Sequence, residues 1–355
     1  MKFIHIADIH MGMAPDKGKI WSNDRTEEIH NTFVKVTKIC EADKIDLLII
    51  AGDLFDSQPT EKQLKELDFR LKQMGGTKTV IVAGDHDYIS KDNKWSEHPF
   101  EADVKILSSE QIDEAYFEDL KVSVTGISYG HKECKKNIIE TMAPKREDTY
   151  NILLGHGGDD THMPFSREVV SKLGFDYVAL GHLHKPSHML KNRMAYAGSL
   201  EPLCSTETGK HGYILGEVDE QRNTTISFVP ISRRTYINMC VNVSPSDTNE
   251  DIVEILDEQI KKNGTQNIYN ITIKGSLASN VAINMSAITR RYNVFALNNE
   301  TKNEYNLSEL YECNEGNLLG EFIKEMSKQN QIEEKEIRYK ALRYGVDALL
   351  NIGEE

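Results

Sequence analysis

Short apolar runs in the first half of the chain constrain its fold more than any other feature. Each run is only a few residues long and is rich in Ile, Val and Leu. Continuous apolar runs of this length predict strands that are buried on both faces. The runs are Phe3–Ala7, Leu47–Ala51, Thr79–Ala83, Val122–Ile127, Asn151–Gly155 and Tyr177–Gly181.

Amphipathic stretches between some of these runs predict helices that cover the sheet. Two of them are Asp24–Ala42 and Thr60–Met74, in which apolar residues recur on one helical face. In the first stretch these residues are Ile29, Phe33, Val36 and Cys40. Because strands alternate with helices, we expect an α/β core whose sheet faces are covered.

The pattern changes after Ala195 and predicts further parts of the chain. Hairpin-like strands are expected at about Gly212–Glu217 and Thr225–Val229, and a boundary near Pro230–Arg234. Beyond this boundary the residue pattern predicts strands at Tyr236–Val243, Ile268–Lys274 and Tyr292–Leu297. It predicts helices at Asn249–Lys262 and Val281–Thr289. From Leu307 the chain is charged and helical, with apolar residues at Leu318, Phe322, Met326, Leu342, Val346, Leu349 and Leu350. We therefore expect a core domain over residues 1–232, a small α+β domain over 235–300 and a helical tail over 301–355.

Composition and charge exclude several classes of protein. The net charge of −14 argues against a protein that coats nucleic acid. It is compatible with a nuclease whose metal ions supply the local positive charge. The longest apolar stretch, Leu47–Ala51, is too short to cross a bilayer. The chain opens on a strand without a signal-peptide pattern. Its cysteines lack CxxC spacing and stand at Cys40, Cys134, Cys204, Cys240 and Cys313. We expect a cytoplasmic protein with reduced thiols and no membrane association.

Segments that carry histidine and aspartate follow five of the predicted strands. They are Asp8-Ile9-His10, Gly52-Asp53, Gly84-Asp85-His86-Asp87, Gly155-His156 and Gly181-His182-Leu183-His184. Taken alone, a Gly–Asp pair is usually a turn and a lone loop histidine usually faces solvent. Open α/β sheets, however, bind ligands at the carboxyl ends of their strands. Acids and imidazoles gathered at one sheet edge can hold two metal ions that share a water molecule, and such sites cleave phosphate esters.

The ordered set of segments resembles the signature of the calcineurin-like metallophosphoesterases. The longer segments around these motifs resemble those of the SbcD-type DNA repair exonucleases. These segments are Phe3–His10, Ala51–Asp56, Ala179–His184 and Tyr196–Glu201. The resemblance is strong over about residues 1–230, and the small domain and tail are similar only in order and size. It implies a two-sheet α/β sandwich, with the small α+β domain capping the active-site cleft and a helical C-terminal tail.

The resemblance also implies a role for each matched residue. Asp8, His10 and His184 would hold one metal ion. Asp53 would bridge both ions, and the second ion would be held by Asp85, His156 and His182. His86 would face the scissile phosphate and assist the leaving oxygen without binding metal. Asp87 would either orient His86 or act as a structural carboxylate. The remaining histidines match no ligand position and are interpreted as ordinary polar residues: His5, His30, His98, His131, His162, His188 and His211.

Asp85 departs from the family pattern, which has Asn at this position. Asn supplies a neutral oxygen ligand, whereas Asp supplies a charged one of nearly the same shape. With Asp8, Asp53 and Asp85 ionised, the ligand charge would be −3 against +4 for two divalent ions, so the second ion should bind more tightly. A natural ligand variant is the favoured interpretation, and a changed metal preference or a reduced activity are the alternatives.

The resemblance implies metal-dependent hydrolysis of phosphodiester bonds in DNA, in DNA-end processing and repair. Mn²⁺ is the expected ion, with Fe²⁺, Zn²⁺ and Ni²⁺ as alternatives. Homodimerisation and docking of the tail on an SbcC-like ATPase are also implied. Arg233/Arg234 and Arg290/Arg291 are candidate phosphate contacts. The rival hypotheses are a small-molecule phosphodiesterase or phosphatase of the same superfamily, and a weakly active DNA-binding or scaffolding subunit.

Overall fold

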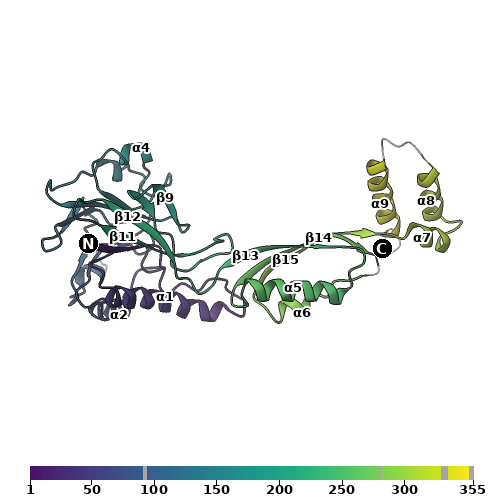
Figure 1. Cartoon of the computed structure of the whole chain (residues 1–355), viewed down its shortest axis with the longest axis horizontal. Coiled ribbons are helices and arrows are strands. Elements are labelled where there is room, and N and C mark those ends of the chain that lie inside the picture. The colour runs from purple at the N-terminus through teal and green to yellow at the C-terminus, as the bar shows by residue number, and fades with distance from the viewer. Residues whose placement is uncertain (91–93, 280, 329–334, 352–355) are drawn as a thin grey trace. The chain divides into compact units, whose positions relative to one another are not determined.

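The computed structural model describes residues 1–355 except residues 91–93, 280, 329–334 and 352–355. The chain divides into two compact units, Met1–Tyr236 and Ile237–Glu355 (Figure 1). No helix within the described ranges is both long enough and apolar enough to cross a membrane.

Two six-stranded sheets form the first unit. One contains β1 (Lys2–Ile6), β2 (Leu47–Ala51), β3 (Lys78–Val82), β4 (Val104–Ile106), β11 (Gly212–Val218) and β12 (Thr224–Pro230), in the order β12-β11-β1-β2-β3-β4. The other contains β5 (Asp113–Phe117), β6 (Val122–Gly126), β7 (Tyr150–His156), β8 (Tyr177–Gly181), β9 (Ser187–Leu190) and β10 (Met194–Tyr196), in the order β5-β6-β7-β8-β10-β9. The predicted two-sheet α/β sandwich is confirmed.

The parallel pairing of the central strands brings their carboxyl ends into line. Ile6 of β1 lies opposite Ile50 of β2, and Ala51 of β2 lies opposite Val82 of β3. In the second sheet His156 of β7 pairs with Gly181 of β8. Every segment that was predicted to carry a metal ligand therefore leaves the sandwich at a strand end.

Apolar side chains fill three layers of the first unit. The middle layer lies between the sheets and joins Phe3 and Ile49 of one sheet to Ile152 of the other. A second cluster packs α1 (Ser22–Ala42) and α2 (Glu61–Lys72) on the outer face of the first sheet. The predicted apolar face of α1 is buried as a whole. A third cluster covers the outer face of the second sheet and includes residues of η1 (Ile139–Thr141) and α4 (Arg167–Val170), whereas Trp95 of α3 (Lys94–Glu97) belongs to the second cluster.

The second unit contains a three-stranded sheet and a helical segment, each with its own apolar cluster. The sheet is formed by β13 (Tyr236–Val243), β14 (Ile268–Ala278) and β15 (Val294–Glu304). In the chain α5 (Asn249–Asn263) connects β13 to β14, and α6 (Ser286–Thr289) lies between β14 and β15. The helical segment contains α7 (Leu307–Cys313), α8 (Leu318–Lys328) and α9 (Lys335–Asn351). β15 continues past residue 300, where the small domain was predicted to end. The domain limits drawn from the sequence otherwise stay a prediction.

One predicted helix of the second unit is shorter in the structure. The helix predicted at Val281–Thr289 forms at Ser286–Thr289, where the side chain of Asn284 accepts from the Ser286 backbone N–H. In α8 the apolar residue Leu318 is 72% exposed. The buried face is centred one residue later, on Leu319 and Ile323, which pack with α9.

A buried ionic network joins α1 to the end of the first unit. Arg25 of α1 is fully buried, and its guanidinium lies 3.0 Å from Glu28 and 3.5 Å from Glu201. Glu28 also accepts from Arg234 at 2.7 Å and from Arg233 at 3.0 Å. Arg234 is 8% exposed. The candidate role of Arg234 as a phosphate contact is therefore wrong, because its charge is used inside the protein.

His5 is a polar residue in the core between the two sheets. Its side chain is fully buried, and its Nδ1 lies 3.0 Å from the Tyr177 hydroxyl of β8. Burial lowers the pKa of His5 from 6.5 to about 3, although a backbone hydrogen bond with Leu180 acts in the opposite direction. The imidazole is therefore neutral in the folded protein at neutral pH.

This burial predicts a loss of stability in acid. The unfolded chain binds the His5 proton near its ordinary pKa of 6.5, and the folded chain binds it only near 3. Stability is therefore complete above pH 6.5 and falls as the pH is lowered towards 3. In this window the free energy of unfolding of the wild type should fall by about 1.4 kcal/mol per pH unit more than that of His5→Leu. Urea unfolding over a pH series measures both slopes. Equal slopes would contradict the prediction, and His188→Leu, at an exposed histidine, should keep the wild-type slope.

The ionic network predicts a second stability effect. Glu28→Ala removes the carboxylate that lies between Arg25 and Arg234, so that buried positive charge is left without its partner. We expect the free energy of unfolding to fall by about 3–5 kcal/mol. Glu27→Ala, one residue earlier on the exposed face of α1, should change it by less than about 0.5 kcal/mol. Equal effects of the two substitutions in denaturant titrations would exclude a special role for Glu28.

Candidate metal centre

The predicted ligands come together at the carboxyl ends of β1, β2, β3, β7 and β8. Backbone hydrogen bonds tie their loops to one another. The Asp8 N–H donates to Gly52 O at 3.1 Å, and the His10 N–H donates to Asp53 O at 3.0 Å. The His182 N–H donates to the Asp8 carboxylate at 2.9 Å. The loops of both sheets are thus fixed against each other before any side chain binds an ion.

Four of the site residues have left-handed backbone conformations. The φ angles are 52° for Asp8, 49° for His10, 50° for Asp53 and 99° for His182. Such conformations cost on the order of 1–3 kcal/mol each in a non-glycine residue and persist only where the surroundings hold them. The loop contacts described above supply that constraint, so backbone strain is concentrated at the predicted ligands.

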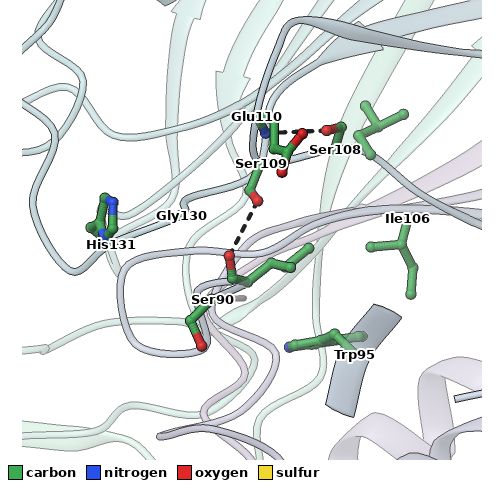
Figure 2. A pocket seen from close by; sticks show the side chains of 10 residues that line it. Ser90, Trp95, Ile106, Ser108, Ser109, Glu110, Gly130 and His131 are labelled. Carbon is green, nitrogen blue, oxygen red and sulfur yellow. Dashed lines mark hydrogen bonds between the residues drawn. The ribbon is translucent and has the colours of Figure 1, made fainter. Parts of the chain in front are cut away.

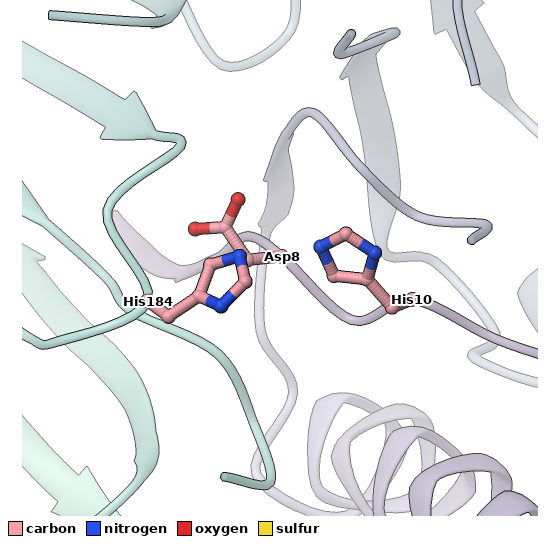
Figure 3. Close-up of side chains that lie close together, drawn as sticks. All are labelled: Asp8, His10 and His184. Carbon is pink, nitrogen blue, oxygen red and sulfur yellow. The ribbon is translucent and has the colours of Figure 1, made fainter. Parts of the chain in front are cut away.

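Asp8, His10 and His184 form the first ligand cluster (Figure 3). One possible donor atom from each lies within 4.8 Å of the other two. Asp8 and His10 are buried, and His184 is partly buried. This is the set predicted for the first metal ion.

Asp85, His156 and His182 form the second cluster. Oδ1 of Asp85 lies 3.0 Å from Nε2 of His156 and 3.2 Å from Nδ1 of His182. Asp53 stands between the clusters, because its Oδ2 lies 3.5 Å from Nε2 of His10 and 3.4 Å from Nε2 of His156. The structure thus brings all seven predicted ligands together and places Asp53 where a bridging carboxylate would stand.

The imidazoles balance the charge of the buried carboxylates. Burial alone would raise the pKa of Asp53, but His156 and His10 lower it to about 2. Burial lowers the pKa of His184, yet its hydrogen bond with Glu207 raises it to about 9. For Asp8, burial dominates and raises the pKa. Binding of a cation is therefore favourable among these carboxylates. In the structure the imidazoles supply the positive charge.

An unpaired nitrogen indicates that the residues fit a metal ion. Nε2 of His10 is buried and has no hydrogen-bond partner among the described residues. A buried polar atom without a partner costs on the order of 1–3 kcal/mol. This nitrogen belongs to the first cluster and also faces Asp53 Oδ2, so an ion held there would satisfy it. The mixture of carboxylate and imidazole donors suits a first-row divalent ion.

Each ligating imidazole is held at one nitrogen and leaves the other to a metal ion. Nδ1 of His156 donates to Ala51 O at 2.8 Å, and Nδ1 of His184 lies 2.7 Å from Glu207. Nδ1 of His10 lies 3.3 Å from Asp56, and Nε2 of His182 lies 2.7 Å from Asp159. Such partners fix the orientation of metal-binding histidines. Asp56, Asp159 and Glu207 were not predicted as site residues. Asp159 stands three residues after His156, which was an available signal, whereas nothing in the sequence marks Glu207.

His86 and Asp87 differ in their surroundings. The side chain of His86 is 41% exposed, and its Nδ1 donates to Asp56 O at 3.1 Å. Asp87 is fully buried, and its carboxylate accepts from the Gly84 N–H at 2.7 Å and from the Phe55 N–H at 3.1 Å. Burial, followed by the charge of Asp53, raises the pKa of Asp87 to about 7. Two backbone amides thus occupy the Asp87 carboxylate, which favours the structural alternative over the orientation of His86, and the role of Asp87 stays a prediction.

His162 lies beside the second cluster, although no ligand position was predicted for it. Its ring centroid lies 4.5 Å from that of His182, and its Nδ1 lies 2.9 Å from Asp159. The interpretation of His162 as an ordinary polar residue did not anticipate this placement in the loop after β7.

A cavity of about 630 Å³ adjoins the loop of His86 (Figure 2). It is lined by residues that include Trp95, Ser109, Glu110 and His131. Trp95 Nε1 donates to Asp87 O at 2.9 Å, so one wall of the cavity is fixed to the loop after β3. None of the residues that line it is a predicted metal ligand.

Comparisons with known proteins agree with this arrangement. The family model described as "Calcineurin-like phosphoesterase" matches residues 1–186, a range that contains every predicted ligand from Asp8 to His184. The chain is 29% identical over 241 residues to a Bacillus subtilis (strain 168) protein named "Uncharacterized metallophosphoesterase YhaO". That match covers 61% of the chain and 57% of the relative, so the chain spans little more than half the length of the relative.

Close packing at a glycine generates a prediction for the site. A Cβ atom added to Gly84 would lie 2.1 Å from Asp53 Oδ1, so Gly84→Ala must displace the carboxylate between the two clusters. We expect the affinity for divalent ions to fall by about 10–100-fold or more. Gly76→Ala is the matched control, because a Cβ there meets nothing within 4 Å. Mn²⁺ titration calorimetry of both variants measures the effect. Unchanged binding in Gly84→Ala would show that Asp53 is not a ligand.

Proposed function

Because the chain belongs to the calcineurin-like phosphoesterase family, we propose that it is a nuclease that hydrolyses phosphodiester bonds in DNA with two divalent metal ions. The observation that carries the proposal is the pair of ligand clusters joined by Asp53 Oδ2. One ion would be held by Asp8, His10 and His184, and the other by Asp85, His156 and His182. Asp53 would contact both ions.

Bound ions would supply positive charge for the phosphate and an activated water molecule for attack on phosphorus. His86 has the position and exposure to act on the substrate. Its Nδ1 is held by Asp56 O, and its Nε2 lies on the side of Asp85 Oδ2, at 3.9 Å. Its exposed ring can therefore reach a phosphate, stabilise the developing charge and give a proton to the leaving oxygen. Asp56 and Asp87 hold the surrounding loop in place.

The choice of DNA as substrate rests on two features of the chain. The residues that flank the ligand segments resemble those of SbcD-type exonucleases. A second unit with its own sheet also follows the phosphoesterase core, whereas a minimal phosphoesterase needs no such addition. We propose that this unit helps to engage DNA. Mn²⁺ is the proposed ion and the cytoplasm the proposed location.

Two kinds of assembly follow from the same proposal. The helices α8 and α9 expose large apolar side chains, among them Leu318, Ile337 and Tyr344. We propose that this surface docks an SbcC-like ATPase, which would also contribute the basic surface that an acidic chain lacks. Homodimerisation through the first unit stays a prediction from resemblance.

A metal-dependent cleavage assay tests the proposed function. The purified chain should cleave blunt, hairpin or single-stranded DNA when Mn²⁺ is added, and a chelator should stop the reaction. His86→Ala should lower the rate by about 100- to 10,000-fold, because it removes a proton donor that faces the substrate. It should bind Mn²⁺ as the wild type does. His188→Ala, which alters an exposed histidine of β9, should keep full activity.

The same assay separates the rival functions. Hydrolysis of a small chromogenic phosphodiester without cleavage of any DNA would favour the small-molecule phosphodiesterase. Binding of DNA with no hydrolysis of either substrate would favour the scaffolding subunit. Full activity of His86→Ala would exclude the role proposed for His86.

A further inference from the structure

His162 lies at the outer edge of the second cluster, where it forms a further candidate ligand group with Asp159 and His182. His162 belongs to the loop after β7 and is 19% exposed at its side chain. Asp159 in the same loop accepts from the backbone N–H groups of Thr161 and His162, at 2.8 and 2.9 Å. The loop is therefore folded around the Asp159 carboxylate.

The Asp159 carboxylate holds two imidazoles at once. Its Oδ2 lies 2.7 Å from Nε2 of His182 and 2.9 Å from Nδ1 of His162. His182 thereby keeps its Nδ1 towards the second cluster. The same carboxylate fixes the ring of His162, so Nε2 of His162 has a defined direction.

That direction leads to Asp85, whose two oxygens have different neighbours. Oδ1 faces the ligands His156 and His182, as described above. Oδ2 faces outward, with Nε2 of His162 at 3.7 Å and Nε2 of His86 at 3.9 Å. Asp159 therefore holds one ring nitrogen of His162, and the other nitrogen points towards the outer oxygen of Asp85.

We propose that His162, held by Asp159, is a positioning residue for the second metal ion. It lies against the outer oxygen of Asp85 and keeps Oδ1 turned towards the ion. The inference rests on the proposed two-metal site but not on the choice of DNA as substrate. Since neither Asp159 nor His162 belongs to the cluster of Asp8, His10 and His184, the first ion should not depend on them.

Two substitutions at position 162 separate the contacts. In His162→Asn the amide nitrogen can replace Nδ1 and keep the contact with Asp159, but the side chain is too short to reach Asp85. In His162→Gln the amide nitrogen stands near the place of Nε2 and can still reach Asp85. We expect His162→Asn to lower the affinity for the second ion about 10–100-fold and His162→Gln to lower it less. The first ion should bind unchanged in both variants.

The coupling between His162 and Asp85 is tested by a double-mutant cycle. Mn²⁺ binding to the full chain is measured by titration calorimetry for the wild type, His162→Asn, Asp85→Asn and the double variant. Asp85→Asn removes the charge from the outer atom of this side chain. In that background His162→Asn should therefore lower the affinity for the second ion by less than about 2-fold. His188→Asn, at an exposed histidine outside the site, is the matched control and should bind both ions as the wild type does.

Several outcomes would overturn the inference. It fails if His162→Asn lowers the affinity for both ions equally. It also fails if this substitution lowers the affinity for the second ion as much in the Asp85→Asn background as in the wild type, or if His162→Gln and His162→Asn lower it equally. The proposed function is judged separately. A wild type that binds two ions but cleaves no DNA would end the nuclease proposal while the cycle stays informative, and loss of coupling with intact cleavage would end only this inference.

Discussion

Three buried carboxylates held at one place are the constraint on which the rest of the structure depends. Asp8, Asp53 and Asp85 are each at most 5% exposed, and like charges this close repel one another in a poorly hydrated site. Imidazoles from both sheets surround them and supply partial compensation. The sandwich must therefore place the ends of five strands in one small volume. The cross-linked loops, the left-handed backbone angles and the glycines without room for a side chain are all consequences of that demand.

The central strands and the ligand set could be predicted because each carries a strong local signal. β2 and β8 have the predicted bounds, since a strand buried on both faces is apolar throughout. β4, β5, β9 and β10 were not predicted. The first three lie at sheet edges, and β10 lies between β8 and β9 but has only three residues. Edge strands face solvent and are short or polar, so their sequence shows neither a continuous apolar run nor a clear alternation. The full length of β15 was not predicted because its distal half is polar and is held by backbone pairing with β14.

The residues around the ligands were harder to predict than the ligands themselves. Asp159 and Glu207 contact ligand imidazoles, and His162 lies beside Asp159. Their positions along the chain follow from loop conformation rather than from a repeating period. Arg234 shows the opposite error. A basic pair resembles a phosphate contact in sequence, yet a buried glutamate on α1, far away in the chain, holds Arg234 inside the first unit. Only the folded chain reveals such long-range pairings.

The glycines at the strand ends also bear on which ions the site can accept. A Cβ at Gly52 would lie 2.2 Å from Nδ1 of His156, and a Cβ at Gly181 would lie 1.8 Å from Ala51 O. A side chain at either position would collide with a ligand imidazole or with the main chain, so these strand ends can approach each other closely because both residues are glycine. Ca²⁺ prefers bonds of about 2.3–2.6 Å and six to eight oxygen ligands. The smaller first-row ions accept imidazole and shorter bonds. The carboxylates and imidazoles carried on these closely packed strand ends therefore suit the smaller first-row ions better than Ca²⁺.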